Sequence, residues 1–352
     1  MDGSERKETA QRALVYVAVA VAVVIVLVFL WYALDVVLLA FLGILVAILV
    51  RAPADWLAEK TGMGKGFSLA MVGIGLLGLI ATGLFFFGKG VAQESLQLVE
   101  RVPEIVEAAK ERLRETELGR RAVDLAESSG MFSGGESQFL GRGLGLLGST
   151  FGAVANVLIV LFFAVFLAMQ PQIYIAGFLF MVPRRKRNRV EQVLYEIGHV
   201  LRRWLVAQSV LAVVVGTLTA IGLLLIGAPF ALPLAVLAGL MEFVPYIGPF
   251  IAAIPAVVVG LGDSPDLALK VALLFVAVQM VESYVLAPLA QHRAVYLPPA
   301  VVLFAQVVMG VVVGGLGVAV ATPLAAALLV AINMLYVQDV LDDKTAGLKT
   351  ET

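Results

Sequence analysis

The sequence has no cysteine and only two histidines, His199 and His292. It therefore excludes disulfides, a thiolate metal site and a thiol nucleophile, and it does not predict a histidine-based zinc site. Charged residues make up only 14% of the 352 residues, whereas soluble domains carry about 25%. The formal net charge of −1 argues against nucleic acid as a partner.

Apolar sequence, in contrast, is abundant. Hydrophobic residues account for 61% of the chain, and the mean hydropathy is +0.99. A helix that crosses a bilayer needs about 20 predominantly apolar residues. Runs close to that length lie at 13–31, 33–50, 66–88, 147–169, 204–226 and 267–286. The pattern predicts an all-α, multi-pass integral membrane protein embedded in a lipid bilayer.

Two further apolar segments are interrupted. Residues 232–261 contain Pro245 and Pro249, each of which would remove a backbone donor from a continuous helix and clash with its preceding turn. We therefore expect a re-entrant hairpin of two short helices there. Residues 297–336 are interrupted by a cluster of glycines and predict a second hairpin.

The two interrupted segments resemble each other. Each opens with Leu-Pro, breaks at glycine, and leaves through a proline followed by small residues. Each also follows a span that carries a glutamine, Gln208 in one case and Gln279 in the other. Each unit would cross the membrane an odd number of times, so the sequence predicts an inverted repeat. In transporters, paired broken helices of this kind indicate the substrate site.

The remaining segments complete a predicted domain plan. Residues 1–88 would form N-terminal membrane helices, and 89–146 an amphipathic helical insertion outside the bilayer, kinked or broken at Pro103. We interpret that insertion as a solvated cap or, alternatively, as an oligomer contact. Residues 147–203 combine a span with a basic loop, 204–336 form a transport core with both hairpins, and 337–352 a polar tail. The basic loop at 183–189 should lie in the cytoplasm, which places both termini there.

Glu242 and Glu282 are the carboxylates inside the apolar C-terminal half. A charged group at membrane depth costs about 3 kcal/mol on insertion scales and usually marks a pathway or a relay. Glu242 adjoins the first break, and Gln279, Glu282 and Ser283 share one helix face. The alternative is that one or both carboxylates lie near the interface and cap a freed amide.

Backbone groups freed at the two breaks could coordinate an ion or a hydroxyl-rich solute. The predicted substrate or ion pathway comprises Glu242, Pro245, Tyr246, Gly248, Pro249, Gln279, Glu282, Ser283, Gly314, Gly315 and Gly317. Weaker candidates, expected to form interhelical hydrogen bonds or to lie at the interface, are Asp35, Asn156, Gln306 and Asn333. The sequence shows no phosphate loop, catalytic triad or metal-ligand spacing, so we predict no enzyme, cofactor or metal site.

Three blocks of sequence carry a resemblance to a known family. They are Glu242-Phe-Val-Pro-Tyr-Ile-Gly-Pro-Phe-Ile-Ala-Ala-Ile-Pro255, Glu282-Ser-Tyr-Val-Leu-Ala-Pro288 and Gly314-Gly-Leu-Gly-Val-Ala-Val-Ala-Thr-Pro323-Leu-Ala-Ala. In this order they resemble the autoinducer-2 exporter family of permeases. The resemblance implies a bacterial plasma (inner) membrane protein, homo-oligomers, export of a signalling furanone and, in some members, sodium(lithium)/proton antiport.

The chain departs from the family pattern at two places. Ser283 stands where the family commonly has asparagine, and Leu297 precedes Pro298 where the family often has histidine. These replacements remove an amide and an imidazole, which puts in doubt any polar site carried over from the family to those positions.

Three functions follow as hypotheses. The first is a secondary transporter that exports a small polar solute such as autoinducer-2, coupled to protons or cations. The second is a sodium(lithium)/proton antiporter that uses the same carboxylates, and the third is a non-transporting membrane scaffold. Carboxylates at membrane depth and helix breaks favour transport over the scaffold, because a scaffold needs neither.

Overall fold

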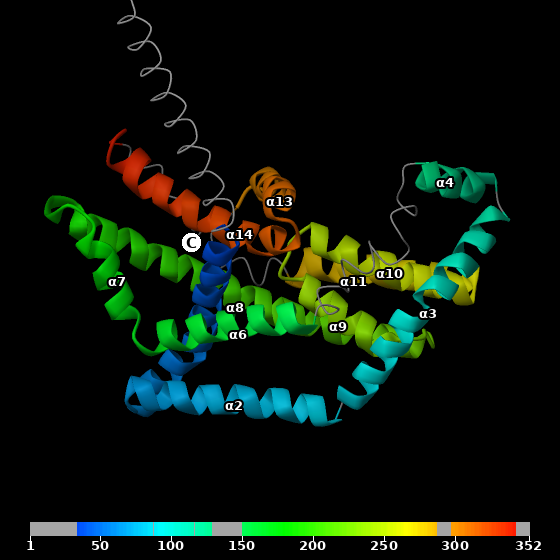
Figure 1. Ribbon diagram of the computed structural model, residues 1–352, viewed down its shortest axis with the longest axis horizontal. Coiled ribbons are helices and arrows are strands. Elements are labelled where there is room, and N and C mark those ends of the chain that lie inside the picture. The colour runs from blue at the N-terminus through cyan, green and yellow to red at the C-terminus, as the bar shows by residue number, and fades with distance from the viewer. Residues whose placement is uncertain (1–33, 87, 116, 129–149, 287–296, 343–352) are drawn as a thin grey trace, which may run out of the picture.

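The computed structural model describes residues 34–86, 88–115, 117–128, 150–286 and 297–342, and within these ranges every regular element is a helix (Figure 1). The helices are Leu34–Thr61, Lys65–Phe86 (α2), Gly88–Arg114 (α3), Glu117–Ser128 (α4), Thr150–Met169 (α6), Pro171–Phe180 (α7), Arg184–Lys186 (η1), Arg187–Leu225 (α8), Ala231–Met241 (α9), Ile247–Asp263 (α10), Pro265–Val281 (α11), Glu282–Leu286 (η2), Pro299–Val313 (α13), Gly315–Ile332 (α14) and Asn333–Gln338 (η3). The predicted first span, 13–31, lies outside the described residues.

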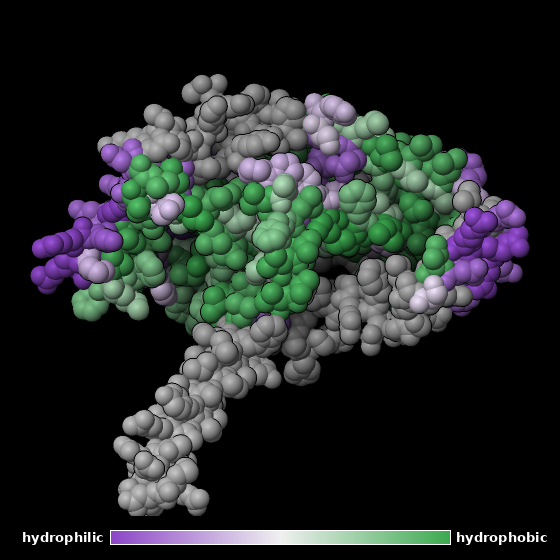
Figure 2. Space-filling view, turned by 90° about the horizontal axis from the view of Figure 1, so that it is seen from above, coloured by the Kyte–Doolittle hydropathy of each residue, from purple (hydrophilic) through white to green (hydrophobic). Residues whose placement is uncertain are grey.

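Four helical segments in the described ranges are long and apolar enough to cross a membrane. They are Leu34–Thr61, Arg184–Leu225, Pro265–Leu286 and Gly315–Gln338, and the pair α6–α7, bent by 88°, would make a fifth. Figure 2 shows apolar side chains over much of the visible body and hydrophilic ones gathered mainly at its two ends. The predicted all-α, multi-pass membrane protein is confirmed.

Both predicted interruptions are present. The first hairpin consists of α9 with 11 residues and α10 with 17, each too short to span. The second pairs the 15-residue α13 with α14, which η3 extends to a segment of membrane-spanning length. The second hairpin is thus asymmetric, with a short entering arm and a long returning arm. In each hairpin the two arms pack against each other.

Helix α3 packs along the first hairpin. The amphipathic pattern predicted this helix, and its residues Leu98 and Ile105 join a core cluster with Leu234 of α9 and Val259 of α10. Pro103 lies inside α3 and does not end it. The hairpin of the same chain therefore covers the side of α3 that carries Leu98 and Ile105.

Helix α8 is much longer than the span predicted at 204–226. It runs for 39 residues from Arg187 to Leu225, so the basic segment and the span form one helix. Its first half carries Val193, Val200 and Leu201 at helical spacing, and all three are buried. Val200 and Leu201 share a core cluster with residues of Leu34–Thr61 and α14. Tertiary packing of this stripe extends the helix beyond its apolar part.

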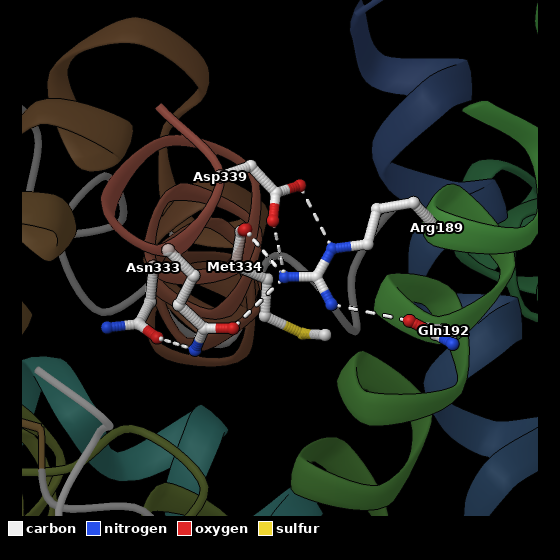
Figure 3. Close-up of polar contacts among 6 residues, drawn as sticks. Arg189, Gln192, Asn333, Met334 and Asp339 are labelled. Carbon is white, nitrogen blue, oxygen red and sulfur yellow. Dashed lines mark hydrogen bonds and ion pairs between the residues drawn. The ribbon is translucent and has the colours of Figure 1, made fainter. Parts of the chain in front are cut away.

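The end of the second hairpin is tied to the start of α8 by Arg189 (Figure 3). The Arg189 guanidinium lies 2.9 and 2.8 Å from the two carboxylate oxygens of Asp339. It also donates hydrogen bonds to the backbone oxygen of Met334, at 2.9 Å, and to the side chain of Gln338, at 3.0 Å. This cluster fixes η3, and with it the exit of α14, against the first turn of α8.

Candidate transport site

The break of the first hairpin follows from Pro245. Helix α9 ends at Met241, and the backbone N–H of Val244 donates to the Met241 carbonyl at 2.9 Å. Pro245 has no N–H to donate to the Met241 carbonyl, so one helical hydrogen bond is missing there, which favours a break. The chain instead makes a three-residue turn, in which the Ile247 N–H donates to the Pro245 carbonyl at 2.8 Å. Tyr246 at its centre has φ 66° and ψ −53°, the strained conformation of a classic γ-turn.

A glycine brings the two arms together in each hairpin. A Cβ on Gly248, in the first turn of α10, would lie 1.9 Å from the Met241 carbonyl oxygen. A Cβ on Gly317, in the first turn of α14, would lie 2.3 Å from the Met309 oxygen. No side chain fits at these distances. The equivalent closure of both hairpins supports the repeat predicted from the sequence.

The structure brings Glu242 and Glu282 together. Glu242 is 3% exposed and lies directly after α9, and Glu282 is the first residue of the π-helical turn η2 at the end of α11. Their side chains interact with each other, electrostatically and through a hydrogen bond. The Gln279 amide donates to the Glu282 carboxylate at 2.6 Å. Three predicted pathway residues thus form one polar group.

Two glutamine amides reach the carbonyls at this break. Gln208 of α8 donates to the Glu242 backbone oxygen, and Gln306 of α13 donates to the Pro245 oxygen at 2.9 Å. The sequence marked Gln208 only as a feature of the repeat, and Gln306 as a weak candidate for an interhelical hydrogen bond. Both bonds are interhelical, and both amides hold carbonyls that we expected to be open to an ion or a solute.

The other predicted pathway residues lie around this group or at the second break. Pro249 follows Gly248 in α10 and is half-buried, whereas Ser283 is exposed. Gly314 ends α13 with φ 81°, and Gly315 begins α14. Gln306 links the two hairpins through its bond to the Pro245 carbonyl. Its amide nitrogen also lies 3.3 Å from the Thr322 hydroxyl of α14.

Of the weaker candidates, Asn333 accepts a hydrogen bond from Gln338 at 2.8 Å, and Asp35 and Asn156 are exposed. Among the described residues, no group of three or more histidine, aspartate or glutamate side chains is placed to hold a metal ion.

Interrupted apolar helices with a buried carboxylate at one break, within a multi-pass helical protein, are features of a membrane transporter. The family model described as AI-2E family transporter matches residues 20–336. The chain belongs to the AI-2E transporter family.

Several curated proteins are similar to this chain, each under the name "Putative transport protein". YueF of Bacillus subtilis (strain 168) is 29% identical over 185 residues, which are 50% of this chain and 49% of YueF. YrrI of the same organism is 27% identical over 149 residues, 42% of each chain. MT0215 of Mycobacterium tuberculosis (strain CDC 1551 / Oshkosh) is 40% identical over 103 residues, 29% of this chain and 28% of MT0215. The chain thus spans about half or less of the length of these relatives.

Proposed function

We propose that this transporter exports a small polar solute of the autoinducer-2 type by secondary transport, coupled to protons or monovalent cations. The observation that carries the proposal is the contact between Glu242 and Glu282 at the break of the first hairpin. The two carboxyl groups come from the two predicted repeat units, and Glu242 is almost completely buried. A group of this kind can exchange its proton for a cation or pass it on when the hairpins move.

The surrounding contacts support a site that rearranges. The carbonyls at the break are held by side chains from α8 and α13, so displacement of either element would uncover carbonyl oxygens. Polar hydroxyl groups of a solute, or a partly dehydrated cation, could then take the place of the glutamine amides. The strained turn at Tyr246 lies in the middle of these contacts.

Sodium(lithium)/proton antiport is the second candidate. The same carboxyl pair favours it, because hard cations prefer carboxylate and carbonyl oxygens as ligands. In both schemes we place the protein in the bacterial inner membrane with its termini in the cytoplasm. The exposed basic residues of η1 support this orientation, since they directly precede the long α8 helix.

The test is proton flux in proteoliposomes that contain the full chain, upon addition of sodium, lithium or the furanone. Wild type is compared with Glu242→Gln and with Glu196→Gln, which removes an exposed carboxylate of α8. Cation-evoked flux that Glu242→Gln abolishes and Glu196→Gln retains would establish antiport. Flux evoked only by the furanone would establish the exporter. Folded protein that responds to none of the three would overturn both schemes in favour of the scaffold.

A further inference from the structure

Gln306 carries an oxygen for which the protein provides no partner. The side chain is completely buried on α13. Its nitrogen donates to the Pro245 carbonyl and the Thr322 hydroxyl, but among the described residues its Oε1 has no hydrogen-bond donor. Leaving a buried acceptor unsatisfied costs about 1–3 kcal/mol. Such a group in a folded protein calls for a ligand or another explanation.

The orientation of this amide is set by its neighbours. If the carboxamide of Gln306 were turned over, Oε1 would face the Pro245 carbonyl oxygen, and two acceptors would meet without a proton. The nitrogen therefore faces the first hairpin. The oxygen, which is bonded to the same carbon, is left without a hydrogen-bond donor among the described residues. The unsatisfied oxygen thus belongs to the same amide whose nitrogen makes the contact between the two hairpins.

The groups that contact the Gln306 amide could serve as ligands of a cation. The Pro245 carbonyl and the Thr322 hydroxyl, both within hydrogen-bond distance of the Gln306 nitrogen, supply further oxygen lone pairs. Carbonyl and hydroxyl oxygens are the ligands with which proteins replace the hydration shell of an alkali cation. The carboxyl pair at the same break, when it shares a single proton, leaves one negative charge that attracts a cation.

We propose that Oε1 of Gln306 is a ligand of the monovalent cation that drives or exchanges in transport, together with the hydroxyl of Thr322. The site joins α13 and α14 of the second hairpin to the break of the first. Occupancy of this site would therefore depend on how the two hairpins are placed. The inference rests on the cation-coupled form of the proposed function. It adds a side chain that coordinates the cation and distinguishes it from other cations.

The test compares cation dependence in four proteins. Proton flux in proteoliposomes is measured against the concentration of lithium, sodium or potassium chloride, with choline chloride to hold ionic strength constant. The variants are Gln306→Met, which keeps the length but removes both polar ends, and Gln306→Glu, which retains an oxygen. The matched control is Thr219→Val, because Thr219 is equally buried on α8 and its hydroxyl also lacks a partner among the described residues.

We expect Gln306→Met to raise the half-saturating cation concentration by about tenfold or more. Gln306→Glu should keep cation-dependent flux but change the order of preference among the three cations, and Thr219→Val should leave both quantities unchanged. A purely structural role of Gln306 would lower the amount of folded protein without changing the cation preference.

A second readout covers the case in which Gln306→Met does not fold. Cation binding should raise the melting temperature of purified wild type in sodium chloride relative to choline chloride, and Gln306→Glu should alter which cation stabilises best. Unchanged half-saturation and preference in the Gln306 variants would overturn the inference alone. A wild type that responds to no cation, in flux or in melting, would overturn the cation coupling itself.

Discussion

The break of the first hairpin depends on the backbone of Tyr246. Its φ of 66° lies in a region that a side chain makes unfavourable by about 1–2 kcal/mol. Glycine adopts this region freely, although in a helix it is less stable than alanine by roughly 0.5–1 kcal/mol. We therefore expect the usual order to be inverted here, with Tyr246→Gly more stable than Tyr246→Ala by about 1 kcal/mol. Melting temperatures of the two purified variants measure this difference, and an alanine variant that melts at or above the glycine variant would refute the turn.

Some residues of the candidate site can be predicted from the sequence, and their contacts cannot. Glu242 and Glu282 could be singled out because a carboxylate is conspicuous in an apolar run. Their role as pathway residues stays a prediction. Their contact could not be predicted, since nothing in the sequence fixes how α9 and α11 approach. The roles of Gln208 and Gln306 were underestimated for a similar reason: an amide can find a partner on any neighbouring helix.

At the scale of elements, the breaks were predictable and the helix lengths were not. Proline at 245 removes a backbone donor, and helix α9 ends before it. Helix α8 begins at Arg187 because apolar residues of its polar half pack against other helices, and a rule based on span length cannot detect such packing. Pro103 was expected to kink or break α3, yet the helix continues through it.

The packing of α3 on the first hairpin gives a prediction at this scale. Leu98 is 9% exposed within the core cluster, whereas Leu96 on the same helix is 64% exposed. Leu98→Ala should lower the free energy of unfolding by about 2–3 kcal/mol because it leaves a cavity. Leu96→Ala should change it by less than about 0.5 kcal/mol. Equal melting temperatures for the two variants would show that α3 does not rest on the hairpin.

At the scale of the whole molecule, composition alone predicted a multi-pass helical membrane protein, and the helices confirm it. The orientation in the membrane rests on the distribution of charge. Because the chain has no cysteine, a single introduced cysteine can be labelled without background, and its labelling reports the orientation. We expect Asn188→Cys, at the basic start of α8, to react with a membrane-impermeant maleimide only from the cytoplasmic side. Gln97→Cys, on the exposed side of α3, should react only from outside, and the reverse labelling pattern would contradict the orientation.

The central claim is that Glu242 and Glu282 act as one unit in transport, and a double-mutant cycle tests it most directly. Proton flux is measured in proteoliposomes for wild type, Glu242→Gln, Glu282→Gln and the double variant, each shown to be folded. Residues that share one proton and one step should give strongly non-additive effects. We predict that each single variant lowers the flux by at least about tenfold and that the double variant is no slower than the slower single one. Two single effects that multiply in the double variant, or a Glu282→Gln variant with wild-type flux, would contradict the account.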